Sequence, residues 1–209
     1  MKVYYEDNEI VVLEKPYGAS SQESNGVSVL SLLKEMGIDA FCVHRLDTQT
    51  TGVMVYAKTS KSASFLSSQM SNRQFYKQYL AVCHGIPQKE GEMLDILYHD
   101  KFKNKSFVVK NKRAGCKEAR LEFWTQGSLK IDEKELSLVK ILLHTGRTHQ
   151  IRVQLSSRGY PLYGDGKYGA KDNGRIALHC HKIRFTHPNG KEMEFVSIPE
   201  GEIWDLEWK

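Results

Sequence analysis

HRLDTQTTGVMVYAK, the stretch from His44 to Lys58, decides the fold. Its second half, Gly52–Ala57, is an apolar run that predicts a buried strand. The polar half predicts a loop at the mouth of that strand, where a rigid element can present a reactive side chain. Asp47 lies in this loop near Arg45 and Thr48, whose charge and hydroxyl group can keep a carboxylate ionised. The alternative is an aspartate that only caps a turn.

Strand and helix patterns continue on both sides of this stretch. An apolar run between turn residues predicts a strand at Ile10–Leu13, and helical spacing predicts helices over Val29–Met36 and Ser60–Gln74. The remaining expected elements are strands at Tyr79–Val82, Phe107–Val109, Ala119–Trp124 and Leu136–Leu143 and a hairpin around His187–Gly190. We therefore expect an α+β protein with a long mixed or antiparallel sheet flanked by a few helices, in a single domain over residues 1–209.

A second dense segment, HTGRTHQIRVQLSSRGYPLYGDGKYG, begins at His144. Thr148 is the expected N-cap of a helix that carries Ile151 and Leu155 on one face and Arg152 on another. A guanidinium anchored in this way can pair with a carboxylate through two hydrogen bonds. The alternative is an arginine that contacts solvent and an ordinary surface acid.

The composition is typical of a globular chain, with 40% hydrophobic and 26% charged residues among 209. No apolar run approaches the roughly 20 residues of a membrane-spanning helix, and the N-terminal segment lacks the pattern of a secretion signal. We therefore expect a cytoplasmic protein with no membrane partner. The four cysteines lie far apart and predict reduced thiols. A net charge of +5 is compatible with a polyanionic partner.

Together these segments resemble the RluA family of pseudouridine synthases. The family's His-Arg-Leu-Asp pattern, with its following Thr, small hydroxyl residue, Gly and Ala-Lys, is matched by residues 44–58, where Thr51 stands in place of the frequent Ser. Other family patterns are matched in order by Lys15–Gly18 (Lys-Pro-x-Gly), Lys77–Tyr79, Gly146–Arg152, Gly164–Gly169 and Leu178–Pro188. Residues 19–25 follow the family pattern poorly. The resemblance still covers nearly the whole chain.

The resemblance implies the pseudouridine synthase fold and the isomerisation of uridine in ribosomal or transfer RNA. This reaction breaks the N1–C1′ bond and rejoins the base through C5, so no cofactor and no metal are expected. Asp47 would attack the ribose or the base, or stabilise charge at C1′. Arg152 would pair with Asp47, and Tyr79 would pack on the target base and help to remove the C5 proton. The alternative for Tyr79 is an aromatic side chain of the core.

The resemblance also implies contacts outside the catalytic pocket. The target uridine must leave its stack, and Arg45 is expected to occupy the vacated space. His44, beside it, is a second expected RNA contact. Many family members carry an added N-terminal RNA-binding domain, whereas the catalytic pattern here starts at about residue 7. RNA selection is therefore expected to rest on the catalytic domain, which we expect to be a monomer.

Between residues 101 and 117 basic and aromatic side chains alternate. Lys101, Lys103 and Lys105 stand with Phe102 and Phe107 in a segment suited to phosphate contact and base stacking. These three lysines are predicted RNA contacts. A solvated charged hairpin is the alternative.

Two other functions fit parts of the sequence. A metal-dependent hydrolase would use His44, His149, His179 and His181 with Asp47 or Asp165, although the histidines lack a recognised zinc spacing. A non-catalytic RNA-binding module or RNA chaperone on the same fold would leave Asp47 without a role.

Overall fold

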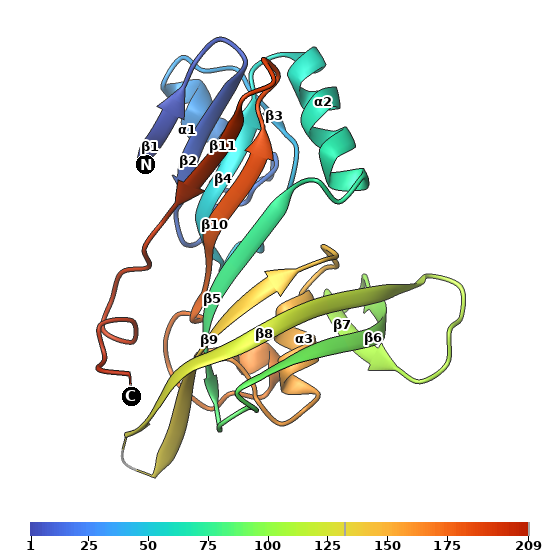
Figure 1. The fold of residues 1–209 in the computed structure, drawn as a ribbon, viewed down its shortest axis with the longest axis vertical. Coiled ribbons are helices and arrows are strands. Elements are labelled where there is room, and N and C mark those ends of the chain that lie inside the picture. The colour runs from blue at the N-terminus through green and yellow to red at the C-terminus, as the bar shows by residue number, and fades with distance from the viewer. Residues whose placement is uncertain (132, 209) are drawn as a thin grey trace. The chain divides into compact units, whose positions relative to one another are not determined.

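The computed structural model describes residues 1–131 and 133–208. Within these residues the chain forms eleven strands and three α-helices. It divides into two compact units, unit 1 (Met1–Gln78 and His179–Pro199) and unit 2 (Tyr79–Leu178 and Glu200–Lys209). Unit 1 thus takes its residues from both ends of the chain, as the blue and red strands of Figure 1 show. The expectation of a single domain over residues 1–209 stays a prediction.

Unit 1 is a mixed sheet. Its strands are β1 (Val3–Glu6), β2 (Ile10–Lys15), β3 (Phe41–Cys42), β4 (Thr51–Ala57), β10 (Leu178–Thr186) and β11 (Glu192–Val196). Strand β2 pairs antiparallel with β1 and β4, β3 pairs antiparallel with β4, and β11 pairs antiparallel with β10. Strand β10 runs parallel to β4. The hairpin expected around residues 187–190 is confirmed by the β10–β11 pair.

The core of unit 1 lies on both faces of β2 and β4. Ile10–Leu13 and Val53–Ala57 are fully buried, which explains why both strands are continuous apolar runs instead of alternating ones. Helix α1 (Val29–Glu35) buries Val29 and Leu33, and helix α2 (Ser60–Ser71) packs on β4. The Asp47 loop, residues 43–50, leads directly into β4, so this buried strand fixes the position of the loop.

Unit 2 is built on an antiparallel sheet. Its strands are β6 (Glu90–Asp100), β7 (Lys105–Val109), β8 (Cys116–Ile131) and β9 (Lys134–Leu143), together with the part of β5 (Tyr76–His84) that follows residue 78. Strand β6 pairs with β7 and β8, and β8 pairs with β9. Helix α3 (Gln150–Ser156) lies behind β8 in Figure 1. It packs there through Val153, which forms a cluster with Leu97, Ala119 and Tyr168.

The α+β class with mixed and antiparallel strands is confirmed, whereas some element boundaries differ. Helix α2 ends at Ser71 instead of Gln74 because Arg73 adopts a left-handed φ of 58°. The expected N-cap role of Thr148 is wrong. The cap is His149, also left-handed at φ 54°, and the Thr148 carbonyl instead accepts a 2.6 Å hydrogen bond from Ser106 Oγ.

Two further expectations concern cysteines and membranes. Cys42, Cys83, Cys116 and Cys180 are all free thiols, as the sequence predicts. In the described part of the chain, no helix combines the length and the apolar character that crossing a bilayer requires.

Candidate active site

The Asp47 loop of unit 1 is held by hydrogen bonds on both sides of Asp47. Asp47 itself is half-buried, and its carbonyl oxygen accepts a 2.9 Å hydrogen bond from the Thr50 N–H, which closes a tight turn. The preceding residue, Leu46, is buried and binds Ser21 Oγ through both its N–H (3.0 Å) and its carbonyl (2.9 Å). The backbone on both sides of Asp47 is therefore fixed, and a fixed backbone is what a reactive carboxylate needs for orientation.

Lys15, at the end of β2, is fully buried beneath this loop. Its Nζ donates to three carbonyl oxygens, those of Pro16 (2.9 Å), Ala19 (2.7 Å) and Thr48 (3.0 Å). Burial lowers the pKa of Lys15 to about 8, and the nearby charge of Asp47 opposes that shift. Lys15 thus ties the loop to the sheet and places a cation close to Asp47.

His44 lies inside unit 1. Its side chain is buried, its ring centroid lies 5.3 Å from that of Phe75, and its Nε2 accepts a 3.2 Å hydrogen bond from the Val55 N–H. Burial holds the pKa of His44 well below its ordinary value, so the ring is neutral. The RNA contact expected of His44 stays a prediction, since the ring is enclosed by the protein in this structure. The ring anchors the start of the loop.

Arg45 has the opposite environment. Its side chain is exposed, and its Nη1 donates a 3.3 Å hydrogen bond to Gln22 Oε1. A long exposed bond of this kind costs little to break. The guanidinium is therefore free to exchange this partner for another acceptor, as a side chain that fills a vacated base position must do.

Arg152 is buried in unit 2 and binds a carboxylate there. Its Nε donates to Asp165 Oδ2 (2.7 Å) and its Nη2 to Asp165 Oδ1 (2.8 Å), and Asp165 is fully buried. The guanidinium carbon also lies 5.1 Å from the centre of the Tyr168 ring. The alternative of a solvent-facing Arg152 is therefore wrong. Its pairing with Asp47, which belongs to the other unit, stays a prediction.

Tyr168 gathers several polar groups around Arg152. Its hydroxyl accepts a 2.8 Å hydrogen bond from the Ser106 N–H and lies 3.0 Å from His149 Nδ1. The residue stands in the short helical turn Gly166–Tyr168 that follows Asp165. The Gly164–Gly169 loop thus supplies both the carboxylate and the aromatic ring that hold Arg152. Sequence reasoning marked this loop only as a matching pattern and gave Tyr168 no role.

Tyr79 is the first residue of unit 2 in the chain and is 5% exposed. A buried tyrosine fits a core position and also fits the wall of a pocket that closes on a base. Its contact with the target base stays a prediction.

The histidines named for a metal-dependent hydrolase are engaged separately. His149 contacts Tyr168 in unit 2, His179 bonds to Thr51 and Ser197 in unit 1, and His181 lies 2.7 Å from the Ser197 carbonyl. Among residues 1–131 and 133–208, no three His, Cys, Asp or Glu side chains are grouped so that they could hold a metal ion.

The predicted RNA contacts Lys101 and Lys103 are exposed in the turn between β6 and β7, and Phe102 between them is fully exposed. Lys105 differs. It is half-buried, its Nζ donates a 2.6 Å hydrogen bond to the Lys167 carbonyl, and it lies 5.1 Å from the centre of the Tyr168 ring. Lys105 therefore ties the hairpin to the loop that holds Arg152, whereas the other two lysines are available to a partner.

Comparisons with known proteins agree with one another. The sequence model of the family described as RNA pseudouridylate synthase matches residues 9–157. An uncharacterized RNA pseudouridine synthase of Aquifex aeolicus (strain VF5) is 34% identical over 98% of this chain and 71% of its own length. Ribosomal large subunit pseudouridine synthase C of Buchnera aphidicola subsp. Acyrthosiphon pisum (strain APS) is 28% identical over 95% of this chain and 67% of its own.

Another relative and two solved structures extend this result. Ribosomal large subunit pseudouridine synthase D of Nitrosomonas europaea is 32% identical over 92% of this chain and 60% of its own length. Human RNA pseudouridylate synthase domain containing 1 superposes with a TM-score of 0.83 at 20% identity, covering 95% of this chain and 83% of its own. Human RNA pseudouridylate synthase domain containing 4 superposes with a TM-score of 0.76 at 24% identity, covering 94% of this chain and 87% of its own. These structures share the fold.

Proposed function

The chain belongs to the RNA pseudouridylate synthase family, and from this premise we propose that it isomerises specific uridines of ribosomal RNA, with Asp47 as the catalytic carboxylate. The observation that carries the proposal is the Asp47 loop, which buried groups of three segments, Lys15, Ser21 and His44, hold in place. Matched relatives named as ribosomal large subunit synthases C and D support ribosomal RNA as the substrate class. Transfer RNA is the other substrate to be tested.

The reaction balances without a co-reactant. Uridine and pseudouridine are isomers: the N1–C1′ bond breaks, a C5–C1′ bond forms, C5 loses its proton and N1 gains one. Asp47 would act on C1′ or on the base while the uracil turns. One oriented carboxylate is enough, unlike the pair of carboxyl groups in most glycosidases.

Arg152 and Tyr79 complete this proposal. We assign Arg152 to pairing with Asp47, and what supports the role is a guanidinium that Asp165 and Tyr168 already hold in one orientation. A cation already held in one orientation would keep the Asp47 carboxylate ionised and oriented in a pocket otherwise unfavourable to charge. Tyr79 is assigned to the face of the target base, on the strength of its burial and its place in the Lys-x-Tyr pattern.

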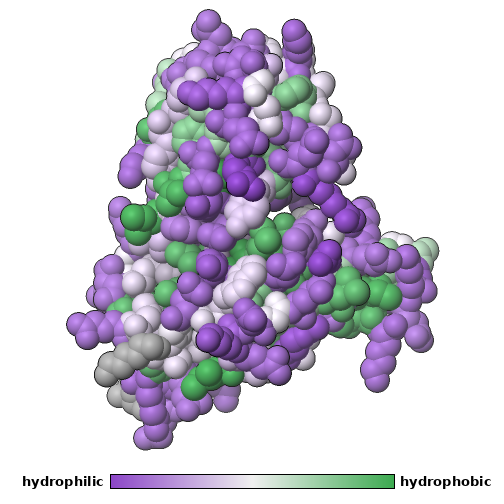
Figure 2. Space-filling view, in the orientation of Figure 1, coloured by the Kyte–Doolittle hydropathy of each residue, from purple (hydrophilic) through white to green (hydrophobic). Residues whose placement is uncertain are grey.

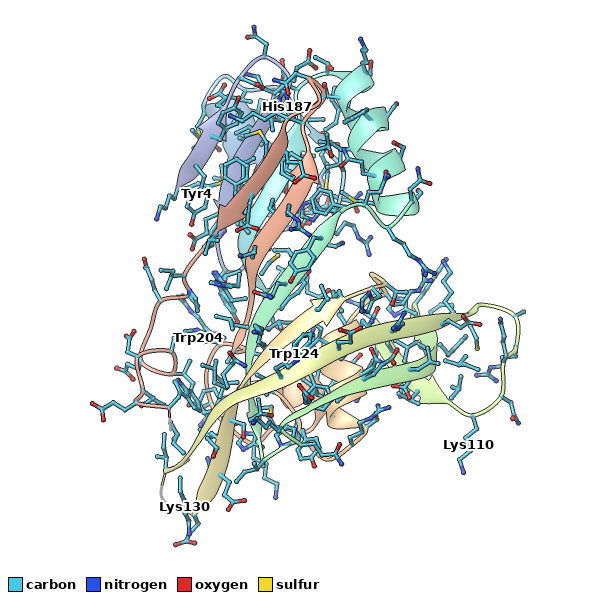
Figure 3. All side chains as sticks on the ribbon, viewed as in Figure 1. Tyr4, Lys110, Trp124, Lys130, His187 and Trp204 are labelled. Atoms are coloured by element: carbon cyan, nitrogen blue, oxygen red, sulfur yellow. The ribbon has the colours of Figure 1, made fainter. Side chains whose placement is uncertain are left out.

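The end of unit 2 at β6 and β7 supports RNA binding. Figure 2 shows apolar side chains gathered there with hydrophilic ones around them, and Figure 3 shows Lys110 projecting away from the strands. The exposed apolar residues include Phe102 and Phe107, and the exposed cations include Lys101 and Lys103. Cations neutralise phosphates while aromatic rings stack on bases, so this surface suits contact with RNA.

The test is pseudouridine mapping in ribosomal and transfer RNA transcripts incubated with the purified protein. Asp47→Asn removes the charge of the proposed carboxylate at almost constant size. Asp39→Asn, at an exposed aspartate of the same unit, is the matched control. We expect new pseudouridines at defined positions of ribosomal RNA with the wild type and with the control, and none with Asp47→Asn.

Other results would change the proposal in defined ways. Modification confined to transfer RNA would overturn the substrate class and keep the activity. Modification by Asp47→Asn at the wild-type rate would overturn the role of Asp47. No observation favours a non-catalytic RNA-binding module, and equal RNA binding by both proteins without any modification, in transcripts and in assembled particles, would be the result in its favour.

A further inference from the structure

A chain of hydrogen bonds crosses unit 1 from the end of the Asp47 loop to β1. Thr51 Oγ1 lies 2.7 Å from His179 Nδ1, and His179 Nε2 lies 2.9 Å from Ser197 Oγ. Ser197 Oγ donates to Glu14 Oε2 at 3.0 Å, and the Tyr4 hydroxyl donates to the same oxygen at 2.6 Å. Five side chains from distant segments of the chain are thus linked in series. We refer to them as the Thr51 relay.

The proton positions in the Thr51 relay follow from its far end. Ser197 has a single hydroxyl proton and gives it to Glu14, so the Ser197 oxygen accepts from His179 Nε2–H. His179 then carries its proton on Nε2, and its Nδ1 accepts the hydroxyl proton of Thr51. The same tautomer explains the 3.3 Å approach of His179 Nε2 to the Ser197 carbonyl. Glu14 therefore determines which nitrogen of His179 carries the proton.

His179 keeps the neutral form that this arrangement needs. Its side chain is almost fully buried, and burial lowers its pKa to about 4, although the charge of Glu14 opposes the shift. At neutral pH the ring therefore has a lone pair on Nδ1 that can accept the Thr51 hydroxyl proton. A protonated ring would offer a second N–H there and could no longer accept the Thr51 hydroxyl.

The contact lies where the loop ends and the sheet begins. Thr51 is the first residue of β4, and the parallel pairing of β10 with β4 sets His179 opposite Thr51 and Cys180 opposite Gly52. The two backbones approach so closely that a Cβ on Gly52 would lie 2.3 Å from the Cys180 carbonyl oxygen. The hydroxyl of Thr51 thus adds a directional bond at the point where the chain leaves the Asp47 turn.

We infer that Thr51 and His179 are positioning residues, which hold the exit of the Asp47 loop so that the carboxylate meets the target nucleoside in one orientation. This inference rests on the role of Asp47 in the proposed function. It requires only a hydroxyl at residue 51, which serine and threonine both supply. Ser197 and Glu14 act through His179 by fixing its tautomer, and none of the four residues is assigned contact with the reacting atoms.

The test compares Thr51→Val with Thr51→Ser. Valine keeps the shape of threonine and removes the hydroxyl, whereas serine keeps the hydroxyl. For the RNA that the mapping identifies, we expect Thr51→Val to lower kcat by roughly 10- to 100-fold with a change in KM below about threefold, because a displaced reacting group loses rate more than affinity. Thr51→Ser should stay within about threefold of the wild type. Ser197→Ala should fall between the two variants, because only the backbone carbonyl of residue 197, 3.3 Å away, then holds the His179 proton on Nε2.

A second measurement does not depend on activity. Amide hydrogen exchange across residues 44–52 should be faster in Thr51→Val than in the wild type and Thr51→Ser, while exchange in α1 stays the same. A wild-type protein that modifies no RNA would contradict the proposed function, and the exchange data would still test the relay. Unchanged exchange in Thr51→Val would overturn the inference. Faster exchange with wild-type kcat would overturn it as well, because the loop would then be held without consequence for the reaction.

Discussion

The Nζ of Lys15 donates a 3.0 Å hydrogen bond to the carbonyl oxygen of Thr48, the residue after Asp47. The same oxygen accepts a 2.9 Å bond from the Gly18 N–H, so the turn after β2 and the Asp47 loop share one acceptor. The ammonium group is fully buried and is surrounded by carbonyl oxygens instead of a single carboxylate. The cation thus serves as a structural support for the loop and also adds positive charge near Asp47.

Replacing Lys15 by methionine should weaken both the loop and the reaction. The carbonyls of Pro16 and Ala19 would lose a donor inside the protein, at a cost of about 1–3 kcal/mol in the free energy of unfolding. We expect kcat to fall by about tenfold or more, because Asp47 loses its orientation and a nearby cation. Urea denaturation and single-turnover kinetics measure the two effects. Lys34→Met, at an exposed position of α1, is the control. If both variants showed the same free energy of unfolding and the same kcat, Lys15 would have no role in supporting the loop.

The buried pair of Arg152 and Asp165 should be essential for the stability of unit 2. Asp165→Asn removes the buried negative charge that the guanidinium binds through two hydrogen bonds. We expect the free energy of unfolding to fall by about 3 kcal/mol or more, as found when one member of a buried pair is removed. In the exposed pair of Lys182 and Glu194, Glu194→Gln should cost less than about 1 kcal/mol. If both variants lose the same free energy of unfolding, burial does not increase the contribution of the Arg152–Asp165 pair to stability.

The exposed turn between β6 and β7 should set the salt dependence of RNA binding. Removing Lys101 and Lys103 together by alanine substitution should weaken binding and reduce the slope of log affinity against log salt by about 0.7–0.9 for each phosphate that is no longer neutralised. Phe102→Ala should cost about 1 kcal/mol or more if a base stacks on the ring. The double variant Lys34→Ala, Lys130→Ala removes the same charge from exposed positions elsewhere. If this control lowers the slope equally, the turn has no special part in binding.

Gly52 should tolerate no side chain. Its φ is +118°, and a Cβ would lie 2.3 Å from the Cys180 carbonyl oxygen and 2.5 Å from its nitrogen, both of which belong to the paired backbone. We expect Gly52→Ala to lower the free energy of unfolding by about 2 kcal/mol or more, from strain and from separation of β4 and β10. Gly26→Ala, at a glycine with open space around it, is the matched control. Urea midpoints that shift equally in both variants would contradict the steric account.

Local patterns predicted the central elements of unit 1 because their causes are local. Val29–Glu35 forms a helix as expected, and its start is fixed by Ser28 and Ser31, whose side chains bond to each other's N–H groups at 3.1 and 3.0 Å. The strand at Ile10–Leu13 was predicted because these residues are buried and therefore uniformly apolar, and the observed strand continues to Lys15. The strand Glu90–Asp100 was missed because its acidic, half-exposed residues hide the alternation.

The site was predicted less completely because its geometry depends on contacts between distant residues. Ser106 holds the Thr148 carbonyl across 42 positions of sequence, so the start of α3 could not be derived from its own residues. The burial of His44 depends on Phe75, and the partner of Arg152 comes from a later loop. The buried, hydrogen-bonded state of Lys15, in contrast, could have been predicted from the sequence. A lysine that ends a buried apolar strand before a proline is placed where its charge needs partners.

Acidification should destabilise the protein through its buried histidines. Burial lowers the pKa of His179 from 6.5 to about 4 and that of His44 well below 6.5, so between pH 6.5 and 4 the unfolded chain binds more protons than the folded one. The stabilising contribution of each neutral ring is therefore complete above pH 6.5 and is lost as the pH falls toward 4, by at most about 1.4 kcal/mol per pH unit for each group. Carboxylates titrate in the same range, so the wild type must be compared with His179→Asn. Urea denaturation at pH 7.5, 6 and 5 should show a shallower pH dependence in His179→Asn, and parallel curves for the two proteins would mean that His179 takes up its proton equally in both states.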